Sequence, residues 1–228
     1  MKRLLLYSLL LCAAVLPMTA CSEVGTAYDS SQSGSDLNSD PSSDYTEDVI
    51  PADEKPTDRV PDIQTTDSFE YEIIDGSAVI TGYTGSSADV LVPTEIGGAP
   101  VTKIGSYAFE AEYDITSVTL PDSIVIIGEG AFMDCSSLTE INIPSAVEGI
   151  DRGAFVACTS LGSITIPESV KYIREEAFTA CEAMTSCNIE NPDLAYENWG
   201  FEELPELVVH APEGSAAAAW AESIGKLG

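Results

Sequence analysis

The chain has little of what catalysis and nucleic-acid binding require. Its 228 residues include one histidine, and 9 Lys and Arg stand against 38 Asp and Glu, a formal net charge of −29. A single histidine removes most acid–base and zinc chemistry. A surface this acidic repels phosphate groups, which argues against nucleic acid as a partner and against direct adsorption to anionic lipid.

The chain also lacks an apolar run long enough to span a bilayer, yet its N-terminus is typical of an exported protein. Lys2 and Arg3 precede an apolar run over residues 4–16, which is shorter than the about 20 residues of a spanning helix. This pattern predicts a signal peptide over residues 1–20. The segment MTAC, ending at Cys21, resembles a bacterial lipobox. The resemblance implies acylation of Cys21 and a lipid anchor on the outer side of the cell membrane; plain secretion is the alternative.

Residues 21–67 contain the lipidation candidate and then mostly Ser, Thr, Asp, Glu and Pro, with isolated apolar residues and no period. Such a segment cannot offset its ordering entropy by burial, so we expect a disordered acidic tether. A passive spacer is the simpler interpretation, and a binding tail is the alternative.

The rest of the chain repeats every 23 residues. The columns of the repeat include Phe109, Phe132, Phe155 and Phe178, then Pro121, Pro144 and Pro167, and then Cys135, Cys158 and Cys181. A fixed period of this length predicts a solenoid in which each unit buries its apolar face against its neighbours. We place the repeats at about 90–114, 115–137, 138–160, 161–183 and, in degenerate form with Gly200-Phe201 at the Ala-Phe position, 184–206.

Within one unit, a short strand points Leu138, Ile141 and Ile143 inward and ends at Pro144, which lacks a donor N–H. The returning side of the coil is expected to bury Val147, Ile150, Ala154, Phe155 and Cys158. Since stacked strands lie about 4.8 Å apart, equivalent side chains should form ladders along the axis.

The pattern LxxIxIPxxVxxIgxxAFxxC resembles the repeat of BspA-like bacterial leucine-rich-repeat surface proteins. The resemblance covers residues 68–228 and implies a leucine-rich-repeat arc with a parallel strand ladder. We expect an N-terminal β-hairpin cap over residues 69–83 with Asp75-Gly76 at its turn, and a loop over residues 97–100. A C-terminal cap over residues 207–228 should hold a last strand at 207–209 and a helix at 215–223.

Few residues are candidates for chemistry. We interpret Cys135, Cys158, Cys181 and Cys187 as buried free thiols, because side chains in a ladder point in parallel and cannot converge on a metal or pair readily. His210 stands alone, and no hydrolase, metalloprotease, phosphate-loop or calcium-loop motif occurs in the sequence. We therefore expect no catalytic residues, no metal site and no cofactor.

The remaining candidate is a surface. Residues between the inward positions of each strand should face the open, concave side of the arc, as a generic soluble face or as a polar binding platform. This candidate binding face consists of Ser117, Thr119, Glu140, Asn142, Ser163, Thr165, Ser186 and Asn188.

Two functions fit this organisation. The resemblance implies a cell-surface adhesion or binding lipoprotein that attaches to host matrix proteins, host cells or other bacteria. The alternative is a structural or accessory envelope lipoprotein that binds cell-wall or exported glycans. In either case the expected partner is a protein or glycan at the cell surface, and the membrane is contacted through the lipid anchor only.

Overall fold

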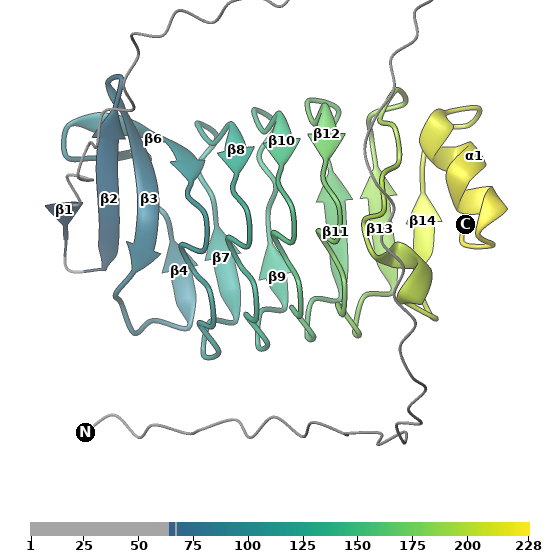
Figure 1. The fold of residues 1–228 in the computed structure, drawn as a ribbon, viewed down its shortest axis with the longest axis horizontal. Coiled ribbons are helices and arrows are strands. Elements are labelled where there is room, and N and C mark those ends of the chain that lie inside the picture. The colour runs from purple at the N-terminus through teal and green to yellow at the C-terminus, as the bar shows by residue number, and fades with distance from the viewer. Residues whose placement is uncertain (1–63, 67) are drawn as a thin grey trace, which may run out of the picture. The chain divides into compact units, whose positions relative to one another are not determined.

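The computed structural model describes residues 64–66 and 68–228, so the signal peptide, Cys21 and almost all of the acidic tether lie outside the described residues. Within them, the chain forms a β-solenoid whose coils stack between a β-hairpin and a helix (Figure 1). The predicted repeat solenoid with a parallel strand ladder and two terminal caps is confirmed. None of the helices in this part of the chain is long and apolar enough to cross a membrane.

The N-terminal cap is the predicted hairpin. Strands β2 (Phe69–Ile74) and β3 (Ser77–Tyr83) pair in antiparallel fashion, and β1 (Gln64–Thr65) adds to the outer edge of β2. Asp75 and Gly76 form the turn with φ values of 51° and 78°. Two positive φ values in a two-residue turn match the twist of the flanking strands, which explains the Asp-Gly pair.

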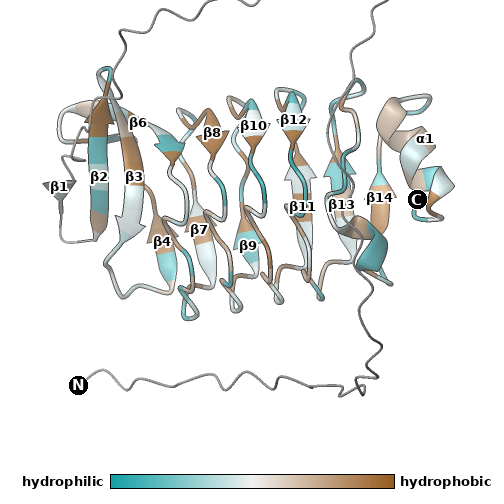
Figure 2. Cartoon of the chain, viewed as in Figure 1, coloured by the Kyte–Doolittle hydropathy of each residue, from teal (hydrophilic) through white to brown (hydrophobic). Residues whose placement is uncertain are grey.

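The coils contribute strands to two parallel strand ladders. The sequence predicted a strand on only one side of each coil. The first ladder comprises β4 (Asp89–Leu91), β7 (Ser117–Thr119), β9 (Glu140–Ile141), β11 (Ser163–Ile166), β13 (Ser186–Ile189) and β14 (Val208–His210). The second continues from β3 through β6 (Ala99–Ile104), β8 (Ile126–Ile127), β10 (Gly149–Ile150) and β12 (Tyr172–Ile173). Figure 2 shows apolar and polar positions alternating along many of these strands, as half-buried strands require.

The phenylalanine column fills the core between the ladders. Adjacent rings from Phe109 to Phe178 lie 4.9–5.4 Å apart between centroids, and all four side chains are fully buried. The degenerate repeat keeps the column, because Phe201 lies 5.1 Å from Phe178. The alanine before each ring allows close approach: the N–H of Phe132 donates to the carbonyl of Ala154 in the next coil at 2.8 Å.

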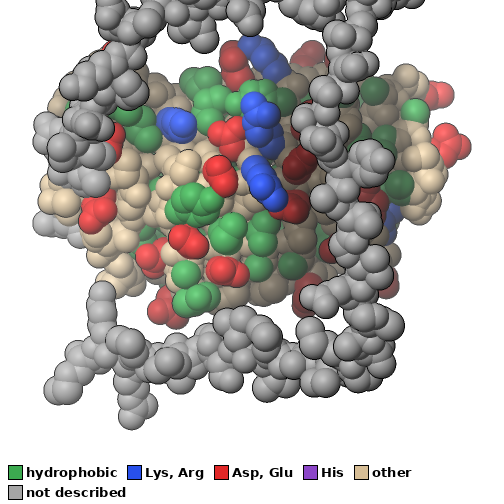
Figure 3. Space-filling view, in the orientation of Figure 1, with side chains coloured by type: hydrophobic (Ala, Val, Ile, Leu, Met, Phe, Trp, Pro, Cys, Tyr) green, Lys and Arg blue, Asp and Glu red, His purple; other side chains and the backbone are tan. Residues whose placement is uncertain are grey.

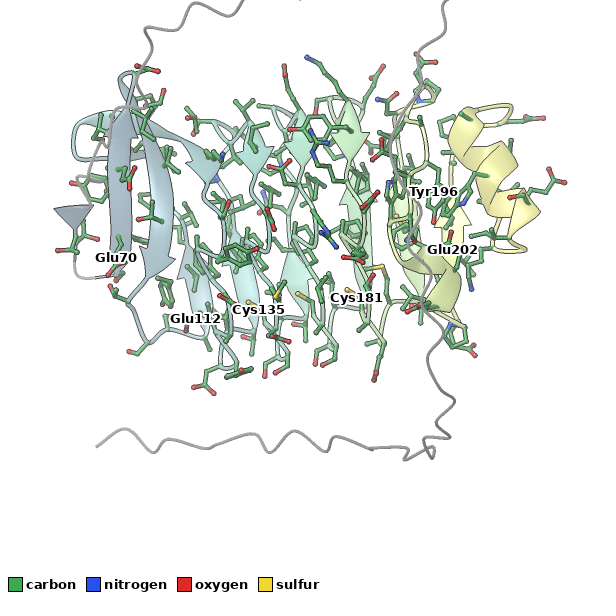
Figure 4. All side chains as sticks on the ribbon, viewed as in Figure 1. Glu70, Glu112, Cys135, Cys181, Tyr196 and Glu202 are labelled. Carbon is green, nitrogen blue, oxygen red and sulfur yellow. The ribbon has the colours of Figure 1, made fainter. Side chains whose placement is uncertain are left out.

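The cysteine column is buried and free of disulfides, as expected (Figure 4). The thiols do more than fill space. Those of Cys135, Cys158 and Cys181 each lie 3.1 Å from a phenylalanine carbonyl of the preceding coil, to which they donate a hydrogen bond. Burial raises the pKa of Cys135 and of Cys181 to about 12, so both remain protonated at neutral pH.

The predicted loop over residues 97–100 is wrong in its second half. Gly97 and Gly98 form a turn with φ values of 62° and 80°, but Ala99 and Pro100 already belong to β6 and pair with β5 (Glu95–Ile96). Two glycines are enough for a tight hairpin turn, because both can take positive φ without strain. Residues 95–100, within the first repeat, therefore form a small hairpin.

The C-terminal cap follows a 3₁₀ turn, η1 (Phe201–Glu203), and consists of β14 and helix α1 (Ala216–Ser223). The Ser215 hydroxyl accepts a hydrogen bond from the N–H of Ala218 at 3.0 Å and begins the helix. Its buried side chains are Ala217, Ala218 and Ala221. The predicted last strand and helix are thus confirmed to within one residue at each boundary.

Candidate binding face

The outward side chains of the first ladder form one surface, here called the strand face. In-register pairing aligns Asp89, Ser117 and Glu140 in one row, and continues with Ser163, Ser186 and Val208. The neighbouring row holds Leu91 and Thr119, then Asn142, and then Thr165, Asn188 and His210. All eight predicted residues lie on this face, and none of them is buried. Their role in binding stays a prediction.

Two of the eight are already occupied by the fold. The hydroxyl of Ser117 donates to the carboxylate of Asp89 at 2.6 Å. The amide of Asn142 accepts from the N–H of Leu120 at 2.7 Å and donates to the carbonyl of the same residue at 2.9 Å. These side chains form hydrogen bonds between neighbouring coils, so they are less available to a ligand than Thr119 or Thr165.

Four members of the face were not predicted from the sequence: Asp89, Leu91, Val208 and His210. The signal for the first two was present, since Val90-Leu91-Val92-Pro93 aligns with Val118 to Pro121. That alignment places Leu91 beside Thr119, where it is 73% exposed. Val208 and His210 follow likewise from placing the last strand in register with β13.

The first ladder is split in the middle. Its strands form two separate three-stranded sheets, β4-β7-β9 and β11-β13-β14, while the second ladder is continuous through the same coils. A column of threonines lies beside the strands, and Gly162 interrupts it at the split. The hydroxyl of Thr139 donates to the carbonyl of Thr116 at 2.9 Å, and that of Thr185 to Gly162 at 3.4 Å. Gly162 occupies the threonine position of its own coil and has no hydroxyl to give.

A pocket of about 330 Å³ lies at this split. It is lined by Thr139, Glu140, Ile141, Asn142, Ile143, Ser163, Ile164 and Thr165. Four of the eight predicted face residues therefore meet in one place, a grouping that the sequence did not indicate. The pocket combines the carboxylate of Glu140 with hydroxyl groups and with the half-buried side chain of Ile143.

The strand face carries carboxylates but no lysine or arginine among its described residues. The three ion pairs of the described region lie elsewhere: Arg152–Glu176 at 2.7 Å, Lys171–Glu148 at 2.8 Å and Arg174–Asp151 at 3.2 Å. Figure 3 shows most of the lysine and arginine side chains on this face beside carboxylates. These exposed pairs contribute little to stability. None of them includes Asp89 or Glu140, so these two carboxylates have no basic partner in the described residues.

The thiols of the cysteine column are poorly suited to nucleophilic chemistry. Burial raises the pKa of every thiol of the cysteine column, which makes these thiols poor nucleophiles. In the part of the chain that the structure describes, His, Cys, Asp and Glu side chains do not gather into a group that could hold a metal ion.

Comparisons with known proteins agree with this architecture. Six copies of the BspA type leucine rich repeat region match residues 102–207. A leucine-rich repeat protein of T. pallidum is 28% identical and has a TM-score of 0.61, covering 65% of this chain and 71% of its own. One from Bacteroides capillosus is 32% identical with a TM-score of 0.51, covering 56% of this chain and 97% of its own.

A third solved structure, the pneumococcal vaccine antigen PcpA, shares the fold at 20% identity and a TM-score of 0.52, covering 65% of this chain and 36% of its own. No curated protein matches the chain. The repeat pattern, the two ladders and the six matched repeat copies lead to one conclusion: the chain belongs to the BspA-type family of bacterial leucine-rich repeat proteins.

Proposed function

We propose that this protein is a cell-surface lipoprotein whose repeat module binds a protein partner through the strand face, as in adhesion to a host matrix. The family is consistent with a protein-binding repeat module. Solenoids present extended surfaces for such binding. The observation that carries the proposal is that side chains without a hydrogen bond inside the described fold, such as Thr119, Ser163 and Thr165, gather on this one face.

The binding proposal is tested with the purified full chain and a panel of purified extracellular-matrix proteins. Thr119→Arg places a bulky cation on the strand face, and we expect it to weaken binding at least tenfold. Ser106→Arg is the matched control, because Ser106 is also exposed but lies in the turn after β6. Equal binding by both variants, or retention of the chain on peptidoglycan with no matrix binding, would contradict the proposal.

The surface anchor depends on Cys21, which lies outside the described residues. We expect Cys21→Ala to release the protein into the medium or to leave it unprocessed, because the acylated thiol would be lost. Cell fractionation followed by immunoblotting measures this. Normal maturation of the variant in the membrane fraction would refute the lipoprotein assignment.

The small size of the face predicts weak binding by one copy. Six strands about 4.8 Å apart span about 24 Å, and a width of about 10 Å gives about 240 Å². A standard interface takes about 800 Å² from each partner. Many copies anchored on one surface would compensate through effective concentration. Surface plasmon resonance with monomeric and bead-clustered full chain should therefore show much slower dissociation for the clusters.

A further inference from the structure

We propose that the pocket between β9 and β11 is an anchor site for an arginine side chain of the partner. The inference rests on the proposed function and adds the chemistry that the partner must present. It follows from three features of the pocket: a backbone carbonyl left by the split ladder, an unpaired carboxylate, and the half-buried side chain of Ile143.

The backbone at the split has hydrogen-bonding capacity that the neighbouring coils use. The carbonyl of Thr116 accepts the N–H groups of Thr139 at 2.9 Å and Glu140 at 3.4 Å, and the carbonyl of Gly162 accepts that of Thr185 at 2.9 Å. The carbonyl of Thr139 holds the equivalent position between them. It receives no N–H from the next coil among the described residues, so an acceptor remains at the edge of the pocket.

The negative charge around the pocket favours a cationic ligand. Glu140 is exposed at the rim and makes no ion pair within the described residues, and the pocket lining contains no basic residue. The chain as a whole carries a formal charge of −29. A cationic group is therefore attracted at long range, whereas an anionic ligand or a second copy of this chain is repelled.

Shape and donor number favour arginine among cationic side chains. Ile143 lines the pocket and is half-buried, so an aliphatic stem can contact its exposed part, whereas Ile141 and Ile164 are buried in the core. A guanidinium brings five N–H donors and no acceptor. It can donate to the Glu140 carboxylate and to the Thr139 carbonyl at once, which the compact ammonium of lysine does less well.

The test uses N-acetyl-arginine amide as the probe and N-acetyl-citrulline amide, its uncharged counterpart, as the control. Each is titrated into the full chain while the backbone amide resonances are followed by NMR. We expect saturable shifts confined to residues 139–143 and 162–166 with the arginine probe, and shifts at least fivefold smaller with citrulline. Equal shifts with both probes, or shifts spread over the acidic surface, would overturn the inference.

Two variants sharpen the test. Glu140→Gln should weaken arginine binding at least fivefold, while Glu168→Gln, an equally conservative change at an exposed carboxylate outside the pocket, should not. Gly162→Thr restores the threonine column and should occupy the Thr139 carbonyl. No atom lies within 4 Å of the Cβ that would be added at Gly162, so we expect this variant to fold and yet to lose arginine binding. Unchanged binding in both Glu140→Gln and Gly162→Thr would refute the site.

The result separates this inference from the proposed function. If Thr119→Arg blocks binding of the protein partner while Glu140→Gln and Gly162→Thr leave it intact, the strand face binds and the arginine anchor is wrong. If the arginine probe binds as described and no strand-face variant alters partner binding, the anchor exists and the proposed role of the face in adhesion fails.

Discussion

The two ladders of this solenoid are built from the same coils but differ in continuity. The second ladder runs unbroken from β3 to β12, whereas the first ladder is split between β9 and β11. Across that split, Phe132 and Phe155 remain stacked at 5.4 Å. The core therefore keeps the coils together where the strand face does not. The difference teaches that repeat packing depends on the buried column, and that the exposed ladder is free to vary.

Removing a ring from the buried column should have the largest effect. Phe155→Ala leaves a cavity between two stacked rings, and we expect it to lower the free energy of unfolding by about 3–5 kcal/mol. Val208→Ala, on the strand face, should change it by less than about 0.5 kcal/mol. Chemical denaturation measures both. Similar costs at the two sites would mean that the column does not dominate the packing.

The side-chain bridge on the strand face should rank second. Asn142→Ala leaves the N–H and carbonyl of Leu120 without their partners, and we expect a loss of about 2 kcal/mol. Asn188→Ala is the control, since Asn188 lies in the same row and its side chain makes no hydrogen bond within the described residues. A cost at Asn188 equal to that at Asn142 would argue against the bridge.

The buried thiols should make the free energy of unfolding fall as the pH rises into the alkaline range. Burial raises the pKa of Cys135 to about 12, against about 8.5 in an unfolded chain, so its contribution is complete below about pH 8.5 and is lost as pH rises toward 12. By linkage, wild-type protein should lose about 2 kcal/mol through this thiol between pH 8 and pH 10. The destabilisation caused by Cys135→Ala should therefore shrink by that amount at pH 10. A constant difference between the two proteins would show that the thiol ionises freely in the fold.

Placing a threonine at position 162 should have the smallest effect, and we expect it to raise the free energy of unfolding. Gly162→Thr adds a hydroxyl that can reach the Thr139 carbonyl, and we expect it to be more stable than Gly162→Ala by about 1 kcal/mol. Both variants lose the backbone freedom of glycine in the unfolded state, so their difference reports the hydroxyl together with the β-branched side chain. A Gly162→Thr protein less stable than Gly162→Ala would mean that the added hydroxyl does not bond to the Thr139 carbonyl.

Much of the fold could be predicted from the sequence because apolar residues recur at fixed positions in every repeat, and these positions form the core. The inward residues of coil 138–160 were assigned from apolar spacing, and Leu138, Val147 and Phe155 are indeed fully buried. The Asp75-Gly76 turn followed from its two-residue signature. The hairpin at Gly97-Gly98 was interpreted as a loop because apolar spacing alone does not show that two short flanking segments pair.

The candidate site was only partly predictable. The period of two along a strand placed Thr119, Ser163 and Thr165 on one face. That same period could not show that Asn142 is used by the backbone of Leu120, since this contact joins residues 22 positions apart. Nor could it show that the ladder breaks beside Gly162, because a glycine outside the apolar columns does not alter the pattern.

The sequence by itself determined the 23-residue period, the buried columns and the two caps, since burial of apolar side chains follows directly from their spacing along the chain. The tertiary structure alone decided where the strand ladder is continuous and which polar groups remain free. Those outcomes depend on hydrogen bonds between neighbouring coils, such as the bonds that the Thr139 and Thr185 hydroxyls donate, and Gly162 beside the split has no hydroxyl to form one.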